Sequence, residues 1–495
     1  MNEPLFLAHR RGGTLLHPTS LPGELTGGDI GAQAFHFIDF LAASGLSVWQ
    51  MLPLGPPHQD GSPYQCLSVH ANNPQLIDLH WLVQQGWLDL DKITEPKNSA
   101  AYRQRCLSQA YQGFLQHAAS DWKIRLQQWV AQQADWLDDY ALFMSIKQGL
   151  QGAAWYDWPL PLRLRETAAL ASARKQCEDQ IAHIEFEQFI FHVQWQVLRE
   201  YAAERNVLLF GDVPIYVSLD SADVWAAREN FLLDQNGHCE WVAGVPPDAF
   251  AEQGQRWGNP LYDWVYQQQN GFDWWIRRMQ TQLDYFDLLR IDHFRGFDAC
   301  WHIAADEETA INGHWVKSPG RQLLQALYDH FGRLPLVAED LGLITEEVIA
   351  LREAFYLPGM KILQFAFDGD PRNLYLPHNH HQNSVVYTGT HDNNTTLGWY
   401  QTLDQNSRRF LHHYLAHSEQ QGLDMPWMMN RVALASVAQL AMIPMQDILS
   451  LDADARMNTP GTMQGNWQWR FEWNQLWDEL ASDLREMMRL YDRVV

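Results

Sequence analysis

Short apolar runs recur along the whole chain, and each of them stops at a turn or at charged residues. Runs of this length, closed by Gly, Pro, Asn or Asp, are typical of buried strands. Segments with apolar residues at helical spacing lie between them, as in the series Phe186, Phe189, Val193, Val197 and Tyr201. The predicted strands are residues 13–16, 48–52, 207–210, 286–291, 336–338, 361–367, 385–388 and 441–445.

Eight strands in alternation with helices predict an α/β fold, and specifically a (β/α)8 TIM barrel. A doubly wound sheet is the alternative, but it requires a Gly-rich GxGxxG turn after an early strand, and the chain has none. Residues 81–200 are rich in Gln, Ala, Leu and Trp at helical spacing with few strand signals, so we expect a mostly helical insertion there. We expect one domain over residues 1–495, with long, largely helical insertions.

Composition narrows the choice of partners. The chain is 46% hydrophobic and 19% charged, and its net charge is −24, which argues against nucleic acid or an anionic membrane as the main partner. Its 5 Cys are scattered, with no CxxC pair, so neither a disulfide framework nor a zinc site is indicated. The chain has no long apolar run and no evident signal peptide, so we expect a cytoplasmic protein. The 23 Trp suggest that rings are available to stack on sugars as well as to fill the core.

Four carboxylates follow or end the predicted strands: Asp212, Asp292, Glu339 and Asp392. In a parallel barrel the carboxyl ends of all strands meet at one mouth, so these side chains should converge there. A divalent metal could gather four carboxylates, but the neighbouring Arg290 and the many aromatic residues argue against one. The tract His378–His381 is more readily interpreted as a polar loop than as a metal site. We therefore expect a carboxylate active site without metal or cofactor.

Two of these carboxylates have contrasting surroundings. Arg290 and Asp292 lie two residues apart on a predicted strand, so they share a face, and the guanidinium should keep Asp292 ionised. A structural ion pair is the alternative interpretation. Glu339 follows the apolar residues 336–338, so partial burial and the adjacent Asp340 should raise its pKa. An ionised and a protonated carboxyl are the recurrent equipment for cleaving glycosidic bonds, and His391 and Asp392 could bind sugar hydroxyls.

Several motifs resemble those of the 4-alpha-glucanotransferase family, also called amylomaltase or disproportionating enzyme, glycoside hydrolase family 77 of the alpha-amylase clan. They are Arg290-Ile291-Asp292-His293-Phe294-Arg295-Gly296, Ala338-Glu339-Asp340-Leu341-Gly342, Gly389-Thr390-His391-Asp392-Asn393, Gly211-Asp212-Val213-Pro214, Val245-Pro246-Pro247-Asp248, Gly254-Gln255-Arg256-Trp257-Gly258-Asn259-Pro260 and Arg456-Met457-Asn458-Thr459-Pro460. The resemblance covers nearly the whole chain and implies a barrel without the separate C-terminal β-domain of typical amylases.

The resemblance also implies a role for each matching residue. Asp292 would be the nucleophile of a retaining mechanism, Glu339 the acid/base and Asp392 the transition-state stabiliser. Residues 245–260 would form a loop over the cleft. The residues expected to bind substrate are Arg290, His391, Asp212, Tyr64, Trp257, Gln255, Phe250, Asp340 and Asn458.

The expected activity is transfer of alpha-1,4-glucan segments from a maltooligosaccharide donor to the 4-hydroxyl of a glucose or glucan acceptor. Two alternatives remain open at the level of sequence. One is an alpha-glucan hydrolase on the same scaffold, which would release sugar to water. The other is a non-catalytic glucan-binding protein, which predicts loss of the nucleophile or the acid, whereas Asp292 and Glu339 are both present.

Overall fold

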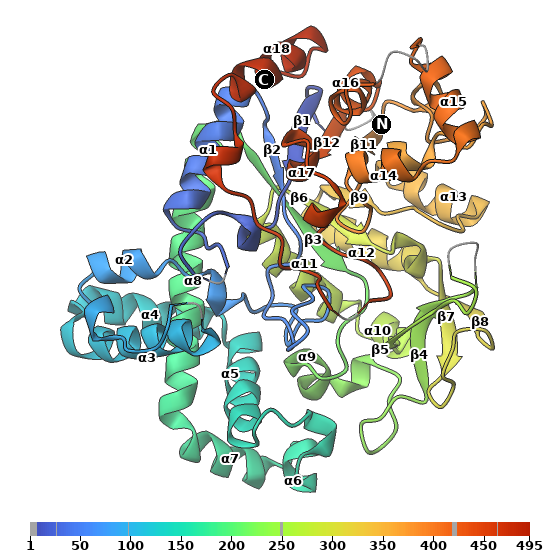
Figure 1. The fold of residues 1–495 in the computed structure, drawn as a ribbon. Helices are drawn as coiled ribbons and strands as arrows, with labels where there is room; N and C mark the ends of the chain where they lie inside the picture. Colours follow the sequence, from blue (N-terminus) through green and yellow to red (C-terminus); the bar gives the residue numbers. More distant parts are fainter. Residues whose placement is uncertain (1–6, 26, 98, 248–250, 418–422, 463) are drawn as a thin grey trace.

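A closed barrel of eight parallel strands forms the centre of the molecule (Figure 1). The computed structural model describes residues 1–495 except 1–6, 26, 98, 248–250, 418–422 and 463. Around the barrel the strand order is β1-β12-β11-β10-β9-β6-β3-β2. The strands are β1 Arg11–Leu15, β2 Val48–Gln50, β3 Leu208–Pro214, β6 Leu288–Asp292, β9 Leu336–Ala338, β10 Gly359–Ile362, β11 Ser384–Tyr387 and β12 Leu440–Pro444.

Each of the eight predicted apolar runs overlaps one of these strands, so the predicted (β/α)8 barrel is confirmed. The prediction for residues 361–367 is wrong beyond Ile362, where β10 ends and a short 3-10 helix, Leu363–Phe365, begins. The apolar run is interrupted there by Gln364, a buried polar side chain. Its side-chain amide donates to the main-chain oxygen of Asn394 at 2.9 Å.

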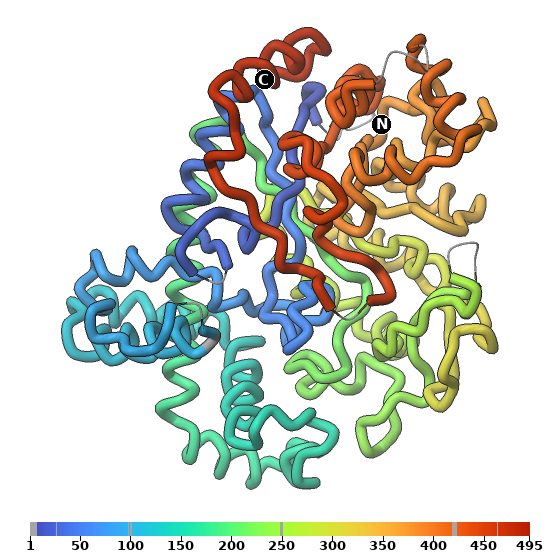
Figure 2. The backbone as a smooth tube through the Cα atoms, viewed as in Figure 1, coloured from blue at the N-terminus to red at the C-terminus, as the bar shows by residue number. Residues whose placement is uncertain are grey.

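Helices surround the barrel and fill the segment between β2 and β3. In Figures 1 and 2 the helices α2 to α7 lie beside the barrel, and the long helix α8 runs from them back along its flank. The helices are α1 Ala32–Ser44, α2 Leu79–Gln84, α3 Ala100–His117, α4 Ser120–Gln132, α5 Ala134–Gly149, α6 Leu160–Arg163, α7 Thr167–Gln176, α8 Glu178–Glu204, α9 Ala222–Ala226, α10 Trp264–Gln269, α11 Asp273–Tyr285, α12 Gly320–Phe331, α13 Glu346–Ala354, α14 Thr396–Thr402, α15 Gln405–Tyr414, α16 Trp427–Ala435, α17 Met445–Ile448 and α18 Leu480–Leu490.

A second, antiparallel sheet stands beside the barrel, with the strand order β5-β4-β7-β8. Its strands are β4 Trp241–Val245, β5 Gln255–Pro260, β7 Ala299–Ala304 and β8 His314–Lys317. Residues 245–260 were expected to be a loop, but β5 pairs with β4, so residues 255–260 of this segment form a strand. Gln255 and Arg256 pair directly with β4, whereas Trp257 lies where the register between the two strands shifts.

After β12 the described residues form helices and irregular segments and no further strand. The last helix, α18, packs against α1 on the outside of the barrel. Within the described part of the chain, no helix is both long and apolar enough to cross a membrane.

Candidate active site

A cleft of about 430 Å³ opens at the carboxyl ends of the barrel strands. The lining includes Pro214 and Asp292 at the ends of β3 and β6, and Glu339 directly after β9. Several strand ends therefore meet in one space, as the fold requires. Eight residues expected at the site line this cleft: Tyr64, Gln255, Trp257, Arg290, Asp292, Glu339, Asp392 and Asn458.

Arg290 joins two carboxylates at the floor of the cleft. Its Nη2 donates to Oδ1 of Asp292 at 2.7 Å, and its Nη1 donates to Oδ2 of Asp212 at 2.6 Å. The first contact follows from strand alternation, because residues two apart on β6 share a face. Asp212 is only 2% exposed, and burial raises its pKa, whereas the charge of Arg290 acts in the opposite direction. The side chain of Asp292 is 30% exposed, so one strand-end carboxylate faces the cleft and the other supports the arginine from below.

Glu339 occupies a different environment from Asp292. Its Oε2 accepts from the main-chain N–H of His293 at 2.8 Å, and its Oε1 accepts from the N–H of Leu341 at 3.2 Å. The pKa of Glu339 is raised to about 8, chiefly by burial; the charge of Arg290 opposes this rise, and the charges of Asp292 and Asp340 contribute to it. At neutral pH the carboxyl therefore carries a proton, while it lines the same cleft as Asp292.

Asp392 is fixed by the segment that follows β12. The side-chain amide of Asn458 donates to its Oδ1 at 2.6 Å, and Nη2 of Arg456 donates to its main-chain oxygen at 2.6 Å. On the other side, Nε2 of His391 lies 3.3 Å from Oδ2 of Asp392. Two loops far apart in sequence thereby fix the carboxylate on the side chain and on the backbone.

An aromatic wall adjoins these carboxylates. The ring of Tyr64 stacks on His391 with centroids 5.1 Å apart and planes inclined by 13°, and Trp467 lies 6.0 Å from each of them. The hydroxyl of Tyr64 donates to Oδ2 of Asp212 at 2.7 Å. This bond ties the ring to the same buried carboxylate that holds Arg290, so the wall and the floor of the cleft are one connected structure.

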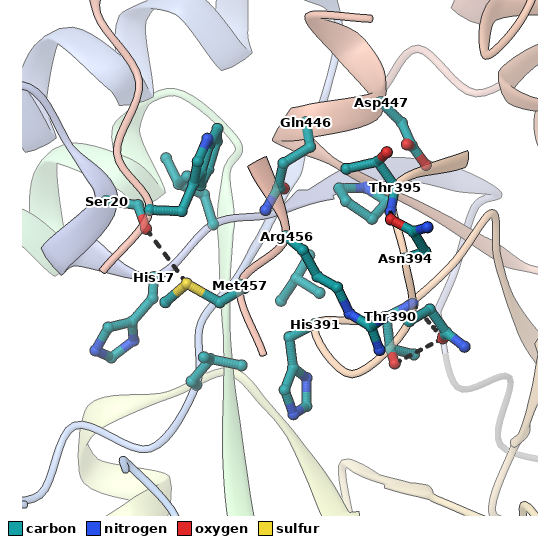
Figure 3. Close-up of a pocket in the computed structure, with 16 residues that line it drawn as sticks. His17, Ser20, Thr390, His391, Asn394, Thr395, Gln446, Asp447, Arg456 and Met457 are labelled. Atoms are coloured by element: carbon teal, nitrogen blue, oxygen red, sulfur yellow. Dashed lines mark hydrogen bonds between the residues drawn. The ribbon is translucent and has the colours of Figure 1, made fainter. Parts of the chain in front are cut away.

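A second cavity of about 30 Å³ adjoins His391 (Figure 3). His17, Gln446 and Met457 are among its lining residues, and burial lowers the pKa of His17 to about 3, so this imidazole is neutral. The volume suits one or two waters and is too small for a sugar. The cavity therefore belongs to the support of His391 and not to the substrate cleft.

A model of the family described as 4-alpha-glucanotransferase matches residues 16–475 of the chain. The chain belongs to the 4-alpha-glucanotransferase family. The resemblance inferred from its motifs is thereby confirmed, and the expected 4-alpha-glucanotransferase activity is supported over a hydrolase or a binding protein.

Named relatives agree with the family assignment over nearly full length. A 4-alpha-glucanotransferase of Thermus thermophilus is 46% identical over 493 residues, which cover 97% of this chain and 99% of the relative. One from Synechocystis sp. is 47% identical, covering 93% of this chain and 94% of the relative. Among solved structures, an amylomaltase from Streptococcus agalactiae in complex with acarbose matches with a TM-score of 0.94 and 36% identity, covering 98% of this chain and 100% of that chain.

Three of the expected glucan-binding residues that the structure describes do not line the cleft. Asp212 and His391 lie directly behind its lining, where they hold Arg290, Tyr64 and Asp392. Asp340 points away from the cleft, because neighbouring residues in extended backbone face opposite sides. The residue is 9% exposed, and its carboxylate accepts from Nη1 of Arg352 at 2.5 Å and from the N–H of Met360 at 2.7 Å, so both oxygens are engaged outside the cleft lining. Phe250 lies outside the described residues.

The structure adds lining residues that were not selected from the sequence. His293 follows Asp292 in the left-handed region at φ 53°, and burial lowers its pKa to about 4. The ring of Trp257 meets it edge-on at 4.8 Å, and Nε1 of Trp257 donates to Oε1 of Gln255 at 3.1 Å. Tyr216 and Trp467 also line the cleft. The motifs contained a signal for His293, because it lies inside the motif Arg290–Gly296 and directly follows Asp292.

Proposed function

We propose that the chain transfers alpha-1,4-glucan segments from a maltooligosaccharide to the 4-hydroxyl of a glucose or glucan acceptor by a retaining double displacement. Asp292 is the nucleophile, and Glu339 is the general acid and then the general base. Asp392 stabilises the positive charge that develops on the sugar ring. The bound sugar takes its place in the cleft between these three carboxyl groups.

In the first step an oxygen of Asp292 attacks the anomeric carbon of the donor. The glycosidic bond breaks as Glu339 gives its proton to the departing 4-oxygen, and a glycosyl ester forms on Asp292. Arg290 holds Asp292 in place through one oxygen, which leaves the other oxygen for attack. Asp392 faces this reaction with its carboxylate oriented by Asn458, so it can strengthen its hold as charge develops.

In the second step the ionised Glu339 removes the proton from the 4-hydroxyl of an acceptor sugar. The acceptor oxygen then attacks the anomeric carbon, the ester bond breaks, and Asp292 is released as a carboxylate. Proton and bond counts are restored, so no co-reactant is needed. Configuration is inverted twice and therefore retained.

Whether a sugar or water accepts the glycosyl group depends on how far the site excludes water. Bulk water is abundant, so a sugar hydroxyl competes only if it is bound and oriented, which is worth a large effective molarity. Trp257 and Gln255 line the cleft from β5, where Gln255 pairs with Val245 of β4 and the side chain of Trp257 donates to that of Gln255. We infer that they form the acceptor side of the cleft.

One observation carries the proposal. Asp292, held by Arg290 and partly exposed, and Glu339, whose pKa is raised to about 8, line the same cleft at neighbouring strand ends. This is the division between a nucleophile paired with a cation and a protonated acid that retaining cleavage requires.

Incubation with maltotriose tests the proposal most simply. Transfer converts it into a ladder of longer and shorter maltooligosaccharides with glucose, whereas hydrolysis gives maltose and glucose only. The reaction is run in water enriched in oxygen-18, because hydrolysis places the label at a new reducing end and transfer does not. Asp292→Asn serves as the inactive control. Label in most of the new reducing ends would contradict the proposal and favour the hydrolase.

A further inference from the structure

A surface groove of about 870 Å³ lies between α16 and α18 and shares no lining residue with the catalytic cleft. Figures 1 and 2 show both helices at the upper edge of the molecule. The volume falls in the range of sites that enclose small organic ligands.

Two tryptophan rings line the groove. Trp427 and Trp477 have their centroids 5.7 Å apart with planes inclined by 56°, and Trp477 is 39% exposed. The indole N–H of Trp477 donates to Oδ2 of Asp483 at 3.2 Å, which fixes the ring through its polar edge and leaves its apolar face for contact. Flat aromatic faces stack on the C–H faces of sugars. Two inclined rings match a curved ligand better than a flat one, and an alpha-1,4-linked chain is curved.

Charged side chains complete the lining. Arg431, Glu486 and Arg489 belong to it, and within the described part of the chain their side chains have no hydrogen-bond or ion-pair partner. These groups are therefore free to bind hydroxyls. Two arginines and three carboxylates line the groove in all, so their charges nearly balance. A near-neutral lining that combines donors, acceptors and rings suits an uncharged polyhydroxyl ligand and does not suit a polyanion.

We propose that the groove between α16 and α18 is an auxiliary binding site for an alpha-1,4-glucan chain. The choice of this sugar rests on the proposed function. The site holds a long glucan on the enzyme while another part of the same polymer enters the catalytic cleft. Linking two sites through one polymer raises the effective concentration at the second, so the groove acts on long glucans and has no effect on maltotriose.

The test compares Trp477→Ala with Tyr328→Ala, a matched change of an aromatic residue that is 45% exposed on α12 and lines neither space. Native gels containing amylopectin measure binding of the full-length chain, with Asp292→Asn added to every variant so that the polymer is not processed. Loss of one stacking ring should weaken retardation by about three- to tenfold. In the active enzyme, kcat/KM for amylopectin as donor should fall by a similar factor, while kcat/KM for maltotriose stays within about twofold.

Arg489→Ala gives a second, independent removal of a groove contact and should shift both amylopectin readouts in the same direction. Unchanged retardation in Trp477→Ala and Arg489→Ala overturns the proposal. An equal loss of kcat/KM for maltotriose also overturns the proposal. So does a dimer of the chain that Trp477→Ala separates into monomers without changing retardation, because the groove would then be an interface between two copies. The two proposals can be told apart. If retardation depends on Trp477 but the active chain makes no ladder from maltotriose, the groove binds glucan and the proposed function is refuted.

Discussion

Glu339→Gln should make the folded chain more stable, and the gain should grow with pH. The pKa of Glu339 is raised by burial from 4.5 to about 8. The unfolded chain releases this proton near 4.5 and the folded chain only near 8, so the stability that Glu339 contributes is complete below about pH 4.5 and is lost as pH rises to about 8. Gln has no proton to lose, so the variant escapes this loss.

The magnitude follows from the two pKa values. A rise from 4.5 to about 8 corresponds to at most about 5 kcal/mol of unfolding free energy. Glu339 lines an open cleft, where solvent screens the charge, so we expect a gain of about 2–3 kcal/mol for the variant at high pH. At neutral pH the folded chain loses stability because it keeps the Glu339 carboxyl protonated. Glu339→Gln removes this loss, so a change that inactivates the enzyme is expected to stabilise its fold.

Urea unfolding of both proteins, followed by tryptophan fluorescence at about pH 5 and about pH 9, measures the effect. Titrating groups elsewhere contribute equally to both proteins, and local differences between Gln and Glu do not depend on pH. The change of the difference with pH therefore reports the titration of Glu339 together with its coupling to the charges of Asp292 and Asp340. A difference in midpoint that is the same at both values would refute the raised pKa and, with it, the role of Glu339 as acid.

Three further outcomes are expected. The alkaline limb of kcat/KM for maltotriose should have its midpoint at about 8, because Glu339 must be protonated, and a profile flat through that range would contradict this. Trp257→Ala should raise the glucose formed per transfer event, measured by chromatography, because the acceptor side opens to water; equal loss of transfer and hydrolysis would argue for packing instead. Arg290→Met should lower stability by about 3–5 kcal/mol in urea unfolding, since it leaves Asp212 buried without its cation, and a loss below about 1 kcal/mol would contradict this.

The barrel could be predicted because each strand is a buried apolar run closed by turn residues. The second sheet could not be predicted in the same way. The strand Gln255–Pro260 contains Gly258, Asn259 and Pro260, which are residues of turns, and its burial pattern is partly exposed. Gln255, Arg256 and Pro260 pair with β4, while Gly258 and Asn259 lie where the register between the strands shifts. The end of β10 was missed for a related reason, because the hydrogen bond of Gln364 joins it to a residue thirty positions away.

The convergence of the carboxylates also followed from the sequence, since strand ends of one barrel must meet. What the strand pattern left open was which residues touch the substrate space and which lie one layer behind it. Asp212 ends up below Arg290, and Asp340 turns to Arg352, because burial and alternation decide the direction of each side chain. The bond between Asn458 and Asp392 joins loops 66 residues apart and could be inferred only through the family motif.

The central claim is a glycosyl ester on Asp292, and trapping it is the most direct test. An alpha-maltosyl fluoride needs no acid to leave, so Glu339→Gln should form the ester and then release it slowly, because the base is missing. Mass spectrometry of proteolytic peptides should then find one added maltosyl group on the peptide that contains Asp292, and none on that peptide in the Glu339→Gln/Asp292→Asn double variant. An adduct on Asp392 or Asp212, or release of fluoride in Glu339→Gln with no adduct on any peptide, would contradict the account.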